Sequence, residues 1–267
     1  MRAVVIIPAR YGSTRLPGKL IHPEAKRVTG KYIIEHVYEK VVEAQRIAAG
    51  DEEPAGASTV MSLPIIATDD ERIFDVVKGF CDNVEMTSTA HQSGTDRIAE
   101  VAAHRDEDII VNVQGDEPEI HPEMIKDLIS ALSKDKEAVM ATLANEIKTV
   151  DELLDPNVVK VVIDNKDYAL YFSRAPIPYL AHGSSLMAHR FFRHIGVYAY
   201  RRDFLLKYTK LPPSPLEEIE RLEQLRALSN GYKIKVSITT FECRGVDTEE
   251  DLKRFLDKYG RQAIGDR

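Results

Sequence analysis

The stretch VVIIPARYGSTRLPGK, residues 4–19, joins an apolar run to a loop that carries three permanent positive charges and two glycines. The run at residues 4–7 is short, rich in β-branched residues and without polar interruption, which is typical of a strand buried on both faces of a sheet. Such α/β sheets bind ligands in loops at the carboxyl ends of their strands. The stretch therefore predicts an α/β fold with an anion site directly after its first strand.

Strands and helices alternate through the first half of the chain. Further strands are expected at residues 64–67, 84–86, 109–113 and 138–143. Apolar residues at helical spacing lie between them, as at Ile33, Val37 and Val41. Parallel strands need helical crossovers of this kind, so the fold class is α/β, a Rossmann-like, mostly parallel sheet flanked by helices.

The pattern changes near residue 157, where strand-like segments follow one another without helices between them. Adjacent strands of this kind predict a small antiparallel portion. The expected strands there are VVKVVID, YALYFSR and FRHIGVYAYR. Beyond them we expect helices at 202–208 and 215–228, a strand at 233–240 and a closing helix at 248–259 with Thr248 as its N-cap.

Length and composition limit the classes of protein that fit. A chain of 267 residues suits a single compact domain, and a net charge of −7 argues against a nucleic-acid-binding surface. Cys81 and Cys243 lack metal-site spacing and are expected to be free thiols. The sequence has neither a long apolar segment nor a signal-peptide pattern, so we expect a cytoplasmic protein without membrane insertion.

The loop at residues 8–19, called the basic loop below, matches neither common phosphate-binding motif. Its glycines are spaced too widely for a P-loop, Lys19 is followed by Leu20 instead of a hydroxyl residue, and GxGxxG is absent. Its composition still favours a polyanion. Arg10, Arg15 and Lys19 supply charge, while Gly12 and Ser13 let backbone N–H groups approach phosphates. A basic loop that is merely solvated is the alternative.

Two acids at the ends of predicted strands are candidate metal ligands. Asp116, in VNVQGDEP at residues 111–118, follows a buried strand, and hard oxygen ligands of this kind select Mg²⁺. Asp247, in RGVDTEEDL at residues 244–252, precedes the last helix. A tight turn is the alternative for Asp116, although a turn would not need Gln114 and two carboxylates, and Asp247 could serve only to stabilise a helix N-terminus. In HQSGTDR, residues 91–97, helix capping by Ser93 is likewise an alternative to ligand binding.

Taken together, the motifs resemble those of the 3-deoxy-manno-octulosonate (Kdo) cytidylyltransferase family over nearly the whole chain. The matching stretches are PARYGSTRLPGK, QSGTDR, VNVQGDEP, YFSRAPIPY, RHIGVYAYR, SPLEEIERLEQLRALSNGY and GVDTEEDL, in the expected order. The resemblance implies a magnesium-dependent homodimer that converts CTP and Kdo into CMP-Kdo and diphosphate for lipopolysaccharide biosynthesis. It also implies one nucleotidyltransferase domain, with a nucleotide-binding core at about 1–156 and 232–267 and a sugar-binding and dimerisation portion at about 157–231.

The resemblance assigns roles to individual residues. The triphosphate and the reacting phosphates would be met by Arg10, Gly12, Ser13, Arg15, Lys19 and Asp116. The base or ribose would be enclosed by Gln92, Ser93, Gly94 and Arg97, and magnesium would be held by Asp116 and Asp247. The sugar acid would be bound by Gln114, Arg174, His194, Glu223 and Gln224. The planar guanidinium of Arg174 suits the sugar's carboxylate.

Structural alternatives remain for the sugar-binding residues. Arg174 could form an ion pair within the fold, His194 could be an interior histidine, and Glu223 could lie on a solvated helix face. The chain departs from the family pattern at two longer segments, near residues 20–29 and 50–63. Alternative functions are a cytidylyltransferase for another acidic sugar, such as an amino-Kdo or a sialic acid, and a catalytically silent nucleotide-binding regulatory protein.

Overall fold

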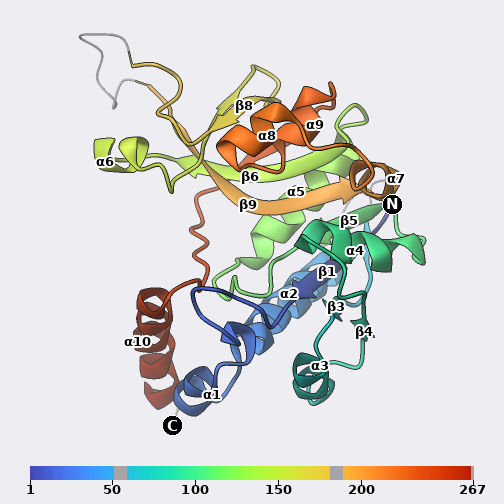
Figure 1. Cartoon of the computed structure of the whole chain (residues 1–267), viewed down its shortest axis with the longest axis vertical. Helices are drawn as coiled ribbons and strands as arrows, with labels where there is room; N and C mark the ends of the chain where they lie inside the picture. Colours follow the sequence, from blue (N-terminus) through green and yellow to red (C-terminus); the bar gives the residue numbers. More distant parts are fainter. Residues whose placement is uncertain (51–58, 181–188, 266–267) are drawn as a thin grey trace. The chain divides into compact units, whose positions relative to one another are not determined.

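The computed structural model describes residues 1–50, 59–180 and 189–265, and the chain forms two compact units. The first consists of Met1–Ile125 and Glu242–Arg267, and the second of Lys126–Phe241. Within the longer segment near residues 50–63, residues 51–58 lie outside the described residues. The chain therefore leaves the first unit once and returns to it with its last segment (Figure 1).

The first unit contains a parallel sheet built around its first strand. β1 (Arg2–Ala9) pairs in parallel with β5 (Ile109–Asn112) on one side and β3 (Ile65–Thr68) on the other. β4 (Val84–Met86) continues the sheet beyond β3, and the short β2 (Val60–Met61) also pairs with β1. Residues 4–7 are completely buried, as their uninterrupted apolar sequence predicts.

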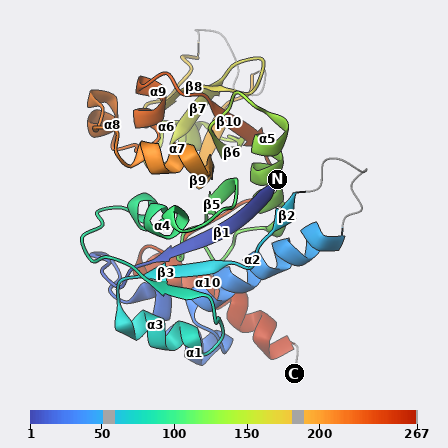
Figure 2. The same cartoon turned by 90° about the vertical axis from the view of Figure 1, so that its right-hand side faces the viewer.

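Helices cover both faces of this sheet. α3 (Glu71–Lys78) connects β3 to β4, whereas α4 (Gly94–Ala103) returns in the opposite direction, from β4 to β5. Right-handed crossovers that run in opposite directions place their helices on opposite faces, as Figure 2 shows for α3 and α4. The direction reverses between β1 and β5, so the ligand-binding crevice of the sheet is expected there.

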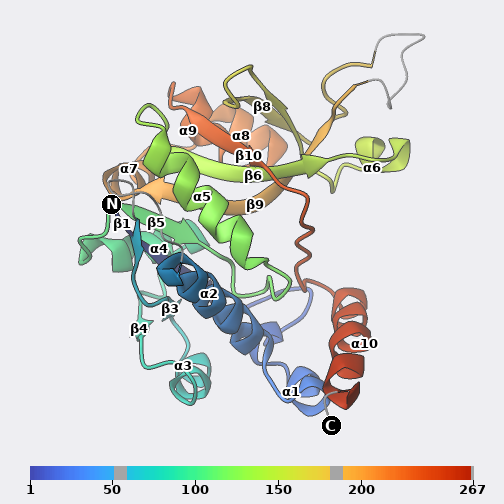
Figure 3. The same cartoon turned by 180° about the vertical axis from the view of Figure 1, so that it is seen from behind.

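The remaining helices of the first unit gather around the basic loop. They are η1 (Lys19–Ile21), α1 (Pro23–Thr29), α2 (Ile33–Gly50) and α10 (Glu249–Gly265), while α5 (Pro122–Lys134) begins in the first unit and ends in the second. Figures 1 and 3 show α10 beside α1. Leu16 of the basic loop is buried with Ile33, Val246 and Phe255, so apolar burial fixes the loop between α2 and α10.

The second unit carries the predicted antiparallel strands. β6 (Met140–Glu146) pairs antiparallel with β9 (Phe192–Arg201) and parallel with β10 (Ile234–Ile238). β7 (Lys160–Ile163) pairs antiparallel with both β9 and β8 (Ala169–Ser173). The short helices α6 (Val150–Leu154) and α7 (Arg202–Tyr208) belong here as well. β6 and β10 thus lie with the antiparallel strands, although the sequence grouped them with the nucleotide-binding part.

One predicted helix is wrong. The segment expected to be helical at residues 215–228 consists of α8 (Pro215–Glu220) and α9 (Leu225–Ser229). Arg221 ends α8 in the left-handed conformation, with φ of 55°, and this turn lets Leu222 and Gln224 become buried. Burial of the apolar Leu222 side chain favours the break over helix continuation, which no local propensity indicated.

Membrane-spanning helices were not expected. Over the described ranges, no helix combines the length and apolar character needed to cross a membrane.

Candidate active site

A cavity of about 290 Å³ opens in the first unit where β1 and β5 end. Its position is the one expected of a ligand site in an open α/β sheet. Twelve residues that the sequence singled out line this cavity, namely Arg10, Gly12, Ser13, Arg15, Lys19, Gln92, Ser93, Gly94, Arg97, Gln114, Asp116 and Asp247. Residues from four separate motifs therefore line one cavity. The alternatives of a solvated loop, a tight turn and helix capping did not require these motifs to meet.

The basic loop is closed by its own backbone. The Gly18 N–H donates to the Tyr11 carbonyl at 3.2 Å, and the Leu16 N–H donates to Ser13 Oγ at 3.3 Å. Gly18 has a φ of +67°, a conformation that favours glycine. Arg10 and Arg15 are exposed to solvent, whereas Lys19 is largely buried. The loop thus holds a compact backbone that presents two solvated cations and one enclosed cation to the cavity.

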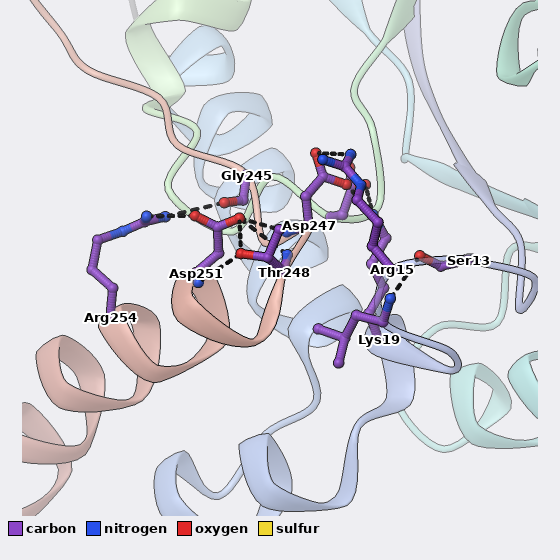
Figure 4. Close-up of polar contacts among 10 residues, drawn as sticks. Ser13, Arg15, Lys19, Gly245, Asp247, Thr248, Asp251 and Arg254 are labelled. Carbon is purple, nitrogen blue, oxygen red and sulfur yellow. Dashed lines mark hydrogen bonds and ion pairs between the residues drawn. The ribbon is translucent and has the colours of Figure 1, made fainter. Parts of the chain in front are cut away.

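The two predicted metal ligands lie on either side of the Lys19 ammonium. Lys19 Nζ donates to Asp247 Oδ1 at 2.7 Å and also bonds to Asp116 Oδ2. Burial alone would lower the pKa of Lys19, but the charges and hydrogen bonds of Asp116 and Asp247 outweigh it and raise this pKa. Arg15 Nη2 lies 3.1 Å from Asp247 Oδ2 (Figure 4). The site therefore brings together two carboxylates that are distant in sequence, around a positive charge.

Backbone contacts hold Asp247 beside Asp116. The Val246 N–H donates to the Asp116 carbonyl at 2.8 Å, so the segment before α10 runs along the end of β5. Thr248 Oγ1 accepts from the Asp251 N–H at 3.2 Å, while the Asp251 carboxylate accepts from the Asp247 and Thr248 N–H groups. The prediction that Thr248 caps the last helix is confirmed, and the cap leaves the Asp247 carboxylate facing the cavity (Figure 4).

Among the residues that the structure describes, no cluster of three or more His, Cys, Asp or Glu side chains could hold a metal ion. The pair of Asp116 and Asp247 suits Mg²⁺ nevertheless, because Mg²⁺ takes few protein carboxylates and completes its coordination with water and phosphate oxygens. The carboxylates already surround one cation, Lys19 Nζ, and they are partly exposed, at 25% and 45% of their side chains. The donor set fits the predicted ion.

The start of α4 forms the opposite wall. Ser93 caps the helix by accepting from the Asp96 N–H at 3.0 Å, so the capping role weighed for Ser93 is present in addition to its place in the cavity. A Cβ on Gly94 would lie 3.2 Å from Gln114 Oε1 and from Pro8 Cγ. Glycine therefore lets the helix N-terminus approach the end of β1 closely.

Arg97 is buried in the same wall and its charge is paired. Its Nη2 donates to Asp69 Oδ2 at 2.7 Å and its Nη1 bonds to Thr87 Oγ1. Asp69 was not among the predicted site residues. Its position in TDD, residues 68–70, directly after a predicted strand, was a usable signal of a site residue. Arg97 is thus held rigidly at the cavity wall with its positive charge offset by a neighbour.

Glu117 is a second acid that was not among the predicted site residues. Cys243 Sγ lies 3.7 Å from its Oε2, and burial together with the nearby Asp116 raises the pKa of Glu117 to about 8. Burial also raises the pKa of the Cys243 thiol. Burial thus favours the neutral form of both side chains beside the metal-ligand candidates.

The predicted sugar-binding residues other than Gln114 lie in the second unit. Arg174 Nε donates to the Glu220 carbonyl at 2.8 Å and its Nη1 to the Pro156 carbonyl at 3.1 Å. The Glu220 carboxylate accepts from the Arg174 N–H and from Ser173 Oγ. The guanidinium is therefore oriented by carbonyl groups, and among the described residues it forms no ion pair of the kind weighed as the alternative.

His194 is held in a neutral form. Burial lowers the pKa of its imidazole to about 3, and Nε2 lies 2.9 Å from Thr142 Oγ1. The Thr142 hydroxyl also reaches the carbonyls of Ile195 and Val197, at 3.1 and 2.9 Å. Because the hydroxyl has only one proton, donation to a carbonyl leaves it to accept from His194 Nε2–H. Nδ1 is then the ring nitrogen that can accept a hydrogen bond.

Glu223 and Gln224 lie in the turn between α8 and α9. Tyr208 Oη donates to the Glu223 carbonyl at 2.6 Å, and the Glu223 residue is half-buried, so it does not lie on the solvated helix face that was weighed for it. Gln224 is 3% exposed, and its Nε2 has no hydrogen-bond partner within the described part of the chain. A buried amide donor costs about 1–3 kcal/mol when neither water nor a ligand satisfies it.

Known proteins share this fold and these motifs. A family model described as cytidylyltransferase matches residues 4–234. A 3-deoxy-manno-octulosonate cytidylyltransferase of Geobacter metallireducens is 46% identical over 272 residues, which cover 99% of this chain and 100% of the relative. The enzyme of that name from Syntrophotalea carbinolica is 48% identical over 260 residues, covering 95% and 97% of the two chains.

Solved structures agree with the sequence relatives. A CMP:2-keto-3-deoxy-manno-octonic acid synthetase complexed with CTP superposes with a TM-score of 0.84 at 38% identity, covering 98% of this chain and 100% of the other. A 4-diphosphocytidyl-2C-methyl-D-erythritol synthase from Anaerococcus prevotii superposes with a TM-score of 0.58 at 15% identity, covering 96% and 95%. The second likeness concerns the fold alone.

Proposed function

Because this chain belongs to the cytidylyltransferase family, we propose that it transfers cytidylate from CTP to Kdo, giving CMP-Kdo and diphosphate. One observation carries the proposal beyond family membership. The basic loop, the start of α4 and the two aspartates of a candidate magnesium site line one cavity, as a triphosphate-binding enzyme requires. The product would serve lipopolysaccharide biosynthesis, as activated Kdo does.

The reaction brings two negatively charged substrates, the triphosphate and the sugar acid, close together. The C2 hydroxyl of the sugar attacks the α-phosphorus in line, the bond from that phosphorus to the α,β-bridging oxygen breaks, and diphosphate leaves with that oxygen. The hydroxyl proton would pass to solvent. Attack by a sugar that carries its own carboxylate on a triphosphate is opposed electrostatically, so neutralising charge is the main catalytic task.

The chain's own residues supply much of that neutralisation. Arg10, Arg15 and Lys19 would stabilise the leaving diphosphate, and backbone N–H groups at Gly12 and Ser13 would add donors to the phosphate oxygens. Asp116 and Asp247 would hold magnesium, which when bound supplies positive charge to the α-phosphate. Support for the last assignment comes from the convergence of both carboxylates on one cation.

The sugar acid would be recognised by residues of the second unit. The charge of Arg174 suits the carboxylate, the neutral His194 suits a hydroxyl group, and the Gln224 amide offers a donor without a partner. Glu223 would accept from a further hydroxyl. Fixing the sugar in this way removes motional entropy before the chemical step.

Diphosphate release measured with CTP and Mg²⁺ tests the function. Kdo is expected to support turnover, and an amino-Kdo or a sialic acid is expected to give at least tenfold lower kcat/KM. If one of the other sugars gave the higher value, the enzyme class would stand and the substrate would be wrong. If none of the sugars supported turnover while CTP still bound, the chain would be the nucleotide-binding regulatory protein.

Two variants test the metal assignment separately. Asp116→Asn and Asp247→Asn remove one charge each with little change in volume, and each is expected to lower kcat by at least 100-fold. Circular dichroism checks that both proteins are folded. Normal turnover in either variant contradicts its assignment as a magnesium ligand.

We also propose a homodimer that works in the cytoplasm. The second unit exposes large apolar side chains, including Leu170 at 60%, Tyr179 at 86% and Ile219 at 77%, which support an interface between copies. Cys81 and Cys243 are free thiols, as in proteins of reducing compartments. Light scattering on wild type and on Leu170→Glu tests the dimer, with a shift toward monomer expected in the variant. A wild-type protein that stays monomeric at micromolar concentration would contradict it.

A further inference from the structure

The position of the Lys19 ammonium between two carboxylates has a consequence for metal binding. Lys19 is only 11% exposed, and its hydrogen bonds reach both Asp116 and Asp247. These carboxylates belong to segments 97 and 228 residues away from Lys19 in the sequence. The ammonium therefore occupies the space between the two groups that are assigned to magnesium.

Without a cation, this arrangement would be unfavourable. Two carboxylates that face one space repel each other, and each favours a positive charge within about 4–6 Å. Lys19 supplies that charge from inside the site, while Arg15, which is 62% exposed, reaches only the outer oxygen of Asp247. Lys19 is thus the main internal counter-ion of the pair.

A divalent cation would compete with this ammonium. Both need the same inward-facing carboxylate oxygens, and two cations in direct contact would repel each other. The lysine side chain is a flexible four-carbon stem that carries a point charge, so it can move its ammonium without moving the backbone. The cavity beside it is lined by Arg10, Gly12 and Ser13, where a triphosphate would offer the ammonium new oxygen partners.

We propose that Lys19 is an internal counter-ion that occupies the metal site until CTP arrives, and that it moves to the triphosphate as the divalent cation binds. This inference rests on the proposed function. It implies that nucleotide and metal bind with positive coupling, since each favours the arrangement in which Lys19 has left the carboxylates. Coupling between two ligands is reciprocal, so CTP raises metal affinity by the factor by which metal raises CTP affinity.

Binding of Mn²⁺, followed by electron paramagnetic resonance, tests the inference without turnover. Without nucleotide, Lys19→Met is expected to bind Mn²⁺ at least tenfold more tightly than wild type, because the variant has no competing ammonium. Lys19→Arg retains a cation and is expected to show no such gain. Lys233→Met, which removes a surface lysine paired with Glu137 in the second unit, is the matched control and should equal wild type.

The same titration with a non-hydrolysable α,β-methylene analogue of CTP tests the coupling. The analogue is expected to tighten Mn²⁺ binding in wild type by at least tenfold more than in Lys19→Met. Equal or weaker Mn²⁺ binding by Lys19→Met without nucleotide overturns the counter-ion role. So does a gain in Lys19→Arg as large as that in Lys19→Met.

A further pair of variants separates this inference from the proposed function. Asp116→Asn and Asp247→Asn are each combined with Lys19→Met and titrated with Mn²⁺. If they abolish Mn²⁺ binding while Lys19→Met equals wild type, the metal site stands and only the counter-ion role fails. If they leave Mn²⁺ binding unchanged, the metal assignment itself fails, and this inference fails with it.

Discussion

The guanidinium of Arg72 lies 3.4 Å from the centre of the Tyr11 ring. The same ring also lies close to Gly18, where a Cβ would be 3.0 Å from Tyr11 Cζ. Arg72 is itself fixed by Asp70, with Nε–Oδ1 and Nη2–Oδ2 distances of 2.9 and 2.6 Å. The closing residues of the basic loop are therefore tied to the start of α3.

Loss of this stacking contact should loosen the basic loop. We expect Arg72→Ala to raise KM for CTP about two- to fivefold, the range that an exposed cation–π contact of about 0.5–1 kcal/mol can supply. Arg72→Lys should recover little of the loss, because an ammonium lacks the planar face. Tyr11→Phe keeps the stack and serves as the control. Steady-state kinetics with each substrate varied would contradict the idea if KM for Kdo rose as much as KM for CTP.

Replacement of Gln224 by methionine should affect stability and function in opposite directions. The variant removes a buried amide without a described partner at nearly constant volume, so we expect the free energy of unfolding to stay level or rise by about 1 kcal/mol. KM for Kdo should rise about tenfold or more, while KM for CTP stays unchanged. Urea denaturation and initial rates measure the two effects. A destabilised variant with normal KM for Kdo would mean that the amide is structural.

Acid should destabilise the first unit through His36. Burial is the largest cause that lowers the pKa of His36, to about 4, and the ring packs on Phe255 and Tyr259 while Nε2 lies 2.9 Å from Thr29 Oγ1. Between pH 6.5 and about 4 the unfolded chain binds this proton and the folded chain does not, so stability falls as pH falls. Removing the titrating group should remove this part of the pH dependence.

Thermal unfolding of His36→Phe tests whether His36 causes stability to fall as pH falls. From pH 7.5 to pH 5, wild type should lose about 1–2 kcal/mol more stability than this variant. The control is His104→Phe, which replaces an exposed histidine at the end of α4 and should retain the wild-type loss. Equal losses in wild type and His36→Phe would show that His36 is not responsible.

A methyl group on Gly115 should disturb the candidate metal site, because Gly115 directly precedes Asp116. Its Cβ would lie 3.1 Å from the Pro8 carbonyl oxygen and 3.3 Å from Leu20 Cδ1, and the neighbouring buried backbone has little room to move. We expect Gly115→Ala to cost about 1–3 kcal/mol of stability and to lower kcat, because Asp116 would shift with it.

The matched control is Gly196→Ala on β9. A Cβ there would meet nothing within 4 Å, so we expect no loss of stability and normal kcat. Urea denaturation and initial rates of both variants are the measurements. A Gly115→Ala protein that equals wild type in both would show that the strand ends adjust freely.

Local sequence predicted much of the fold and the membership of the site. The buried run at residues 4–7 and the helical spacing after it predicted a parallel sheet. The burial of this run and the parallel pairing of its strand are confirmed. The residues of the basic loop and of α4 were predicted as site residues from motifs and do line one cavity. The break at Arg221 was missed because the burial of Leu222, a tertiary effect, favours it.

The amino-acid sequence by itself determined which strands are buried, where the polyanion site begins and which family the chain belongs to, because periodicity, glycine placement and motif spacing are local properties. Only the tertiary structure decided how the charges pair. Lys19 lies between Asp116 and Asp247, and Arg97 lies against Asp69. Such pairs depend on where the chain returns after tens or hundreds of residues, and electrostatic energy depends on distance and burial, which no local pattern contains.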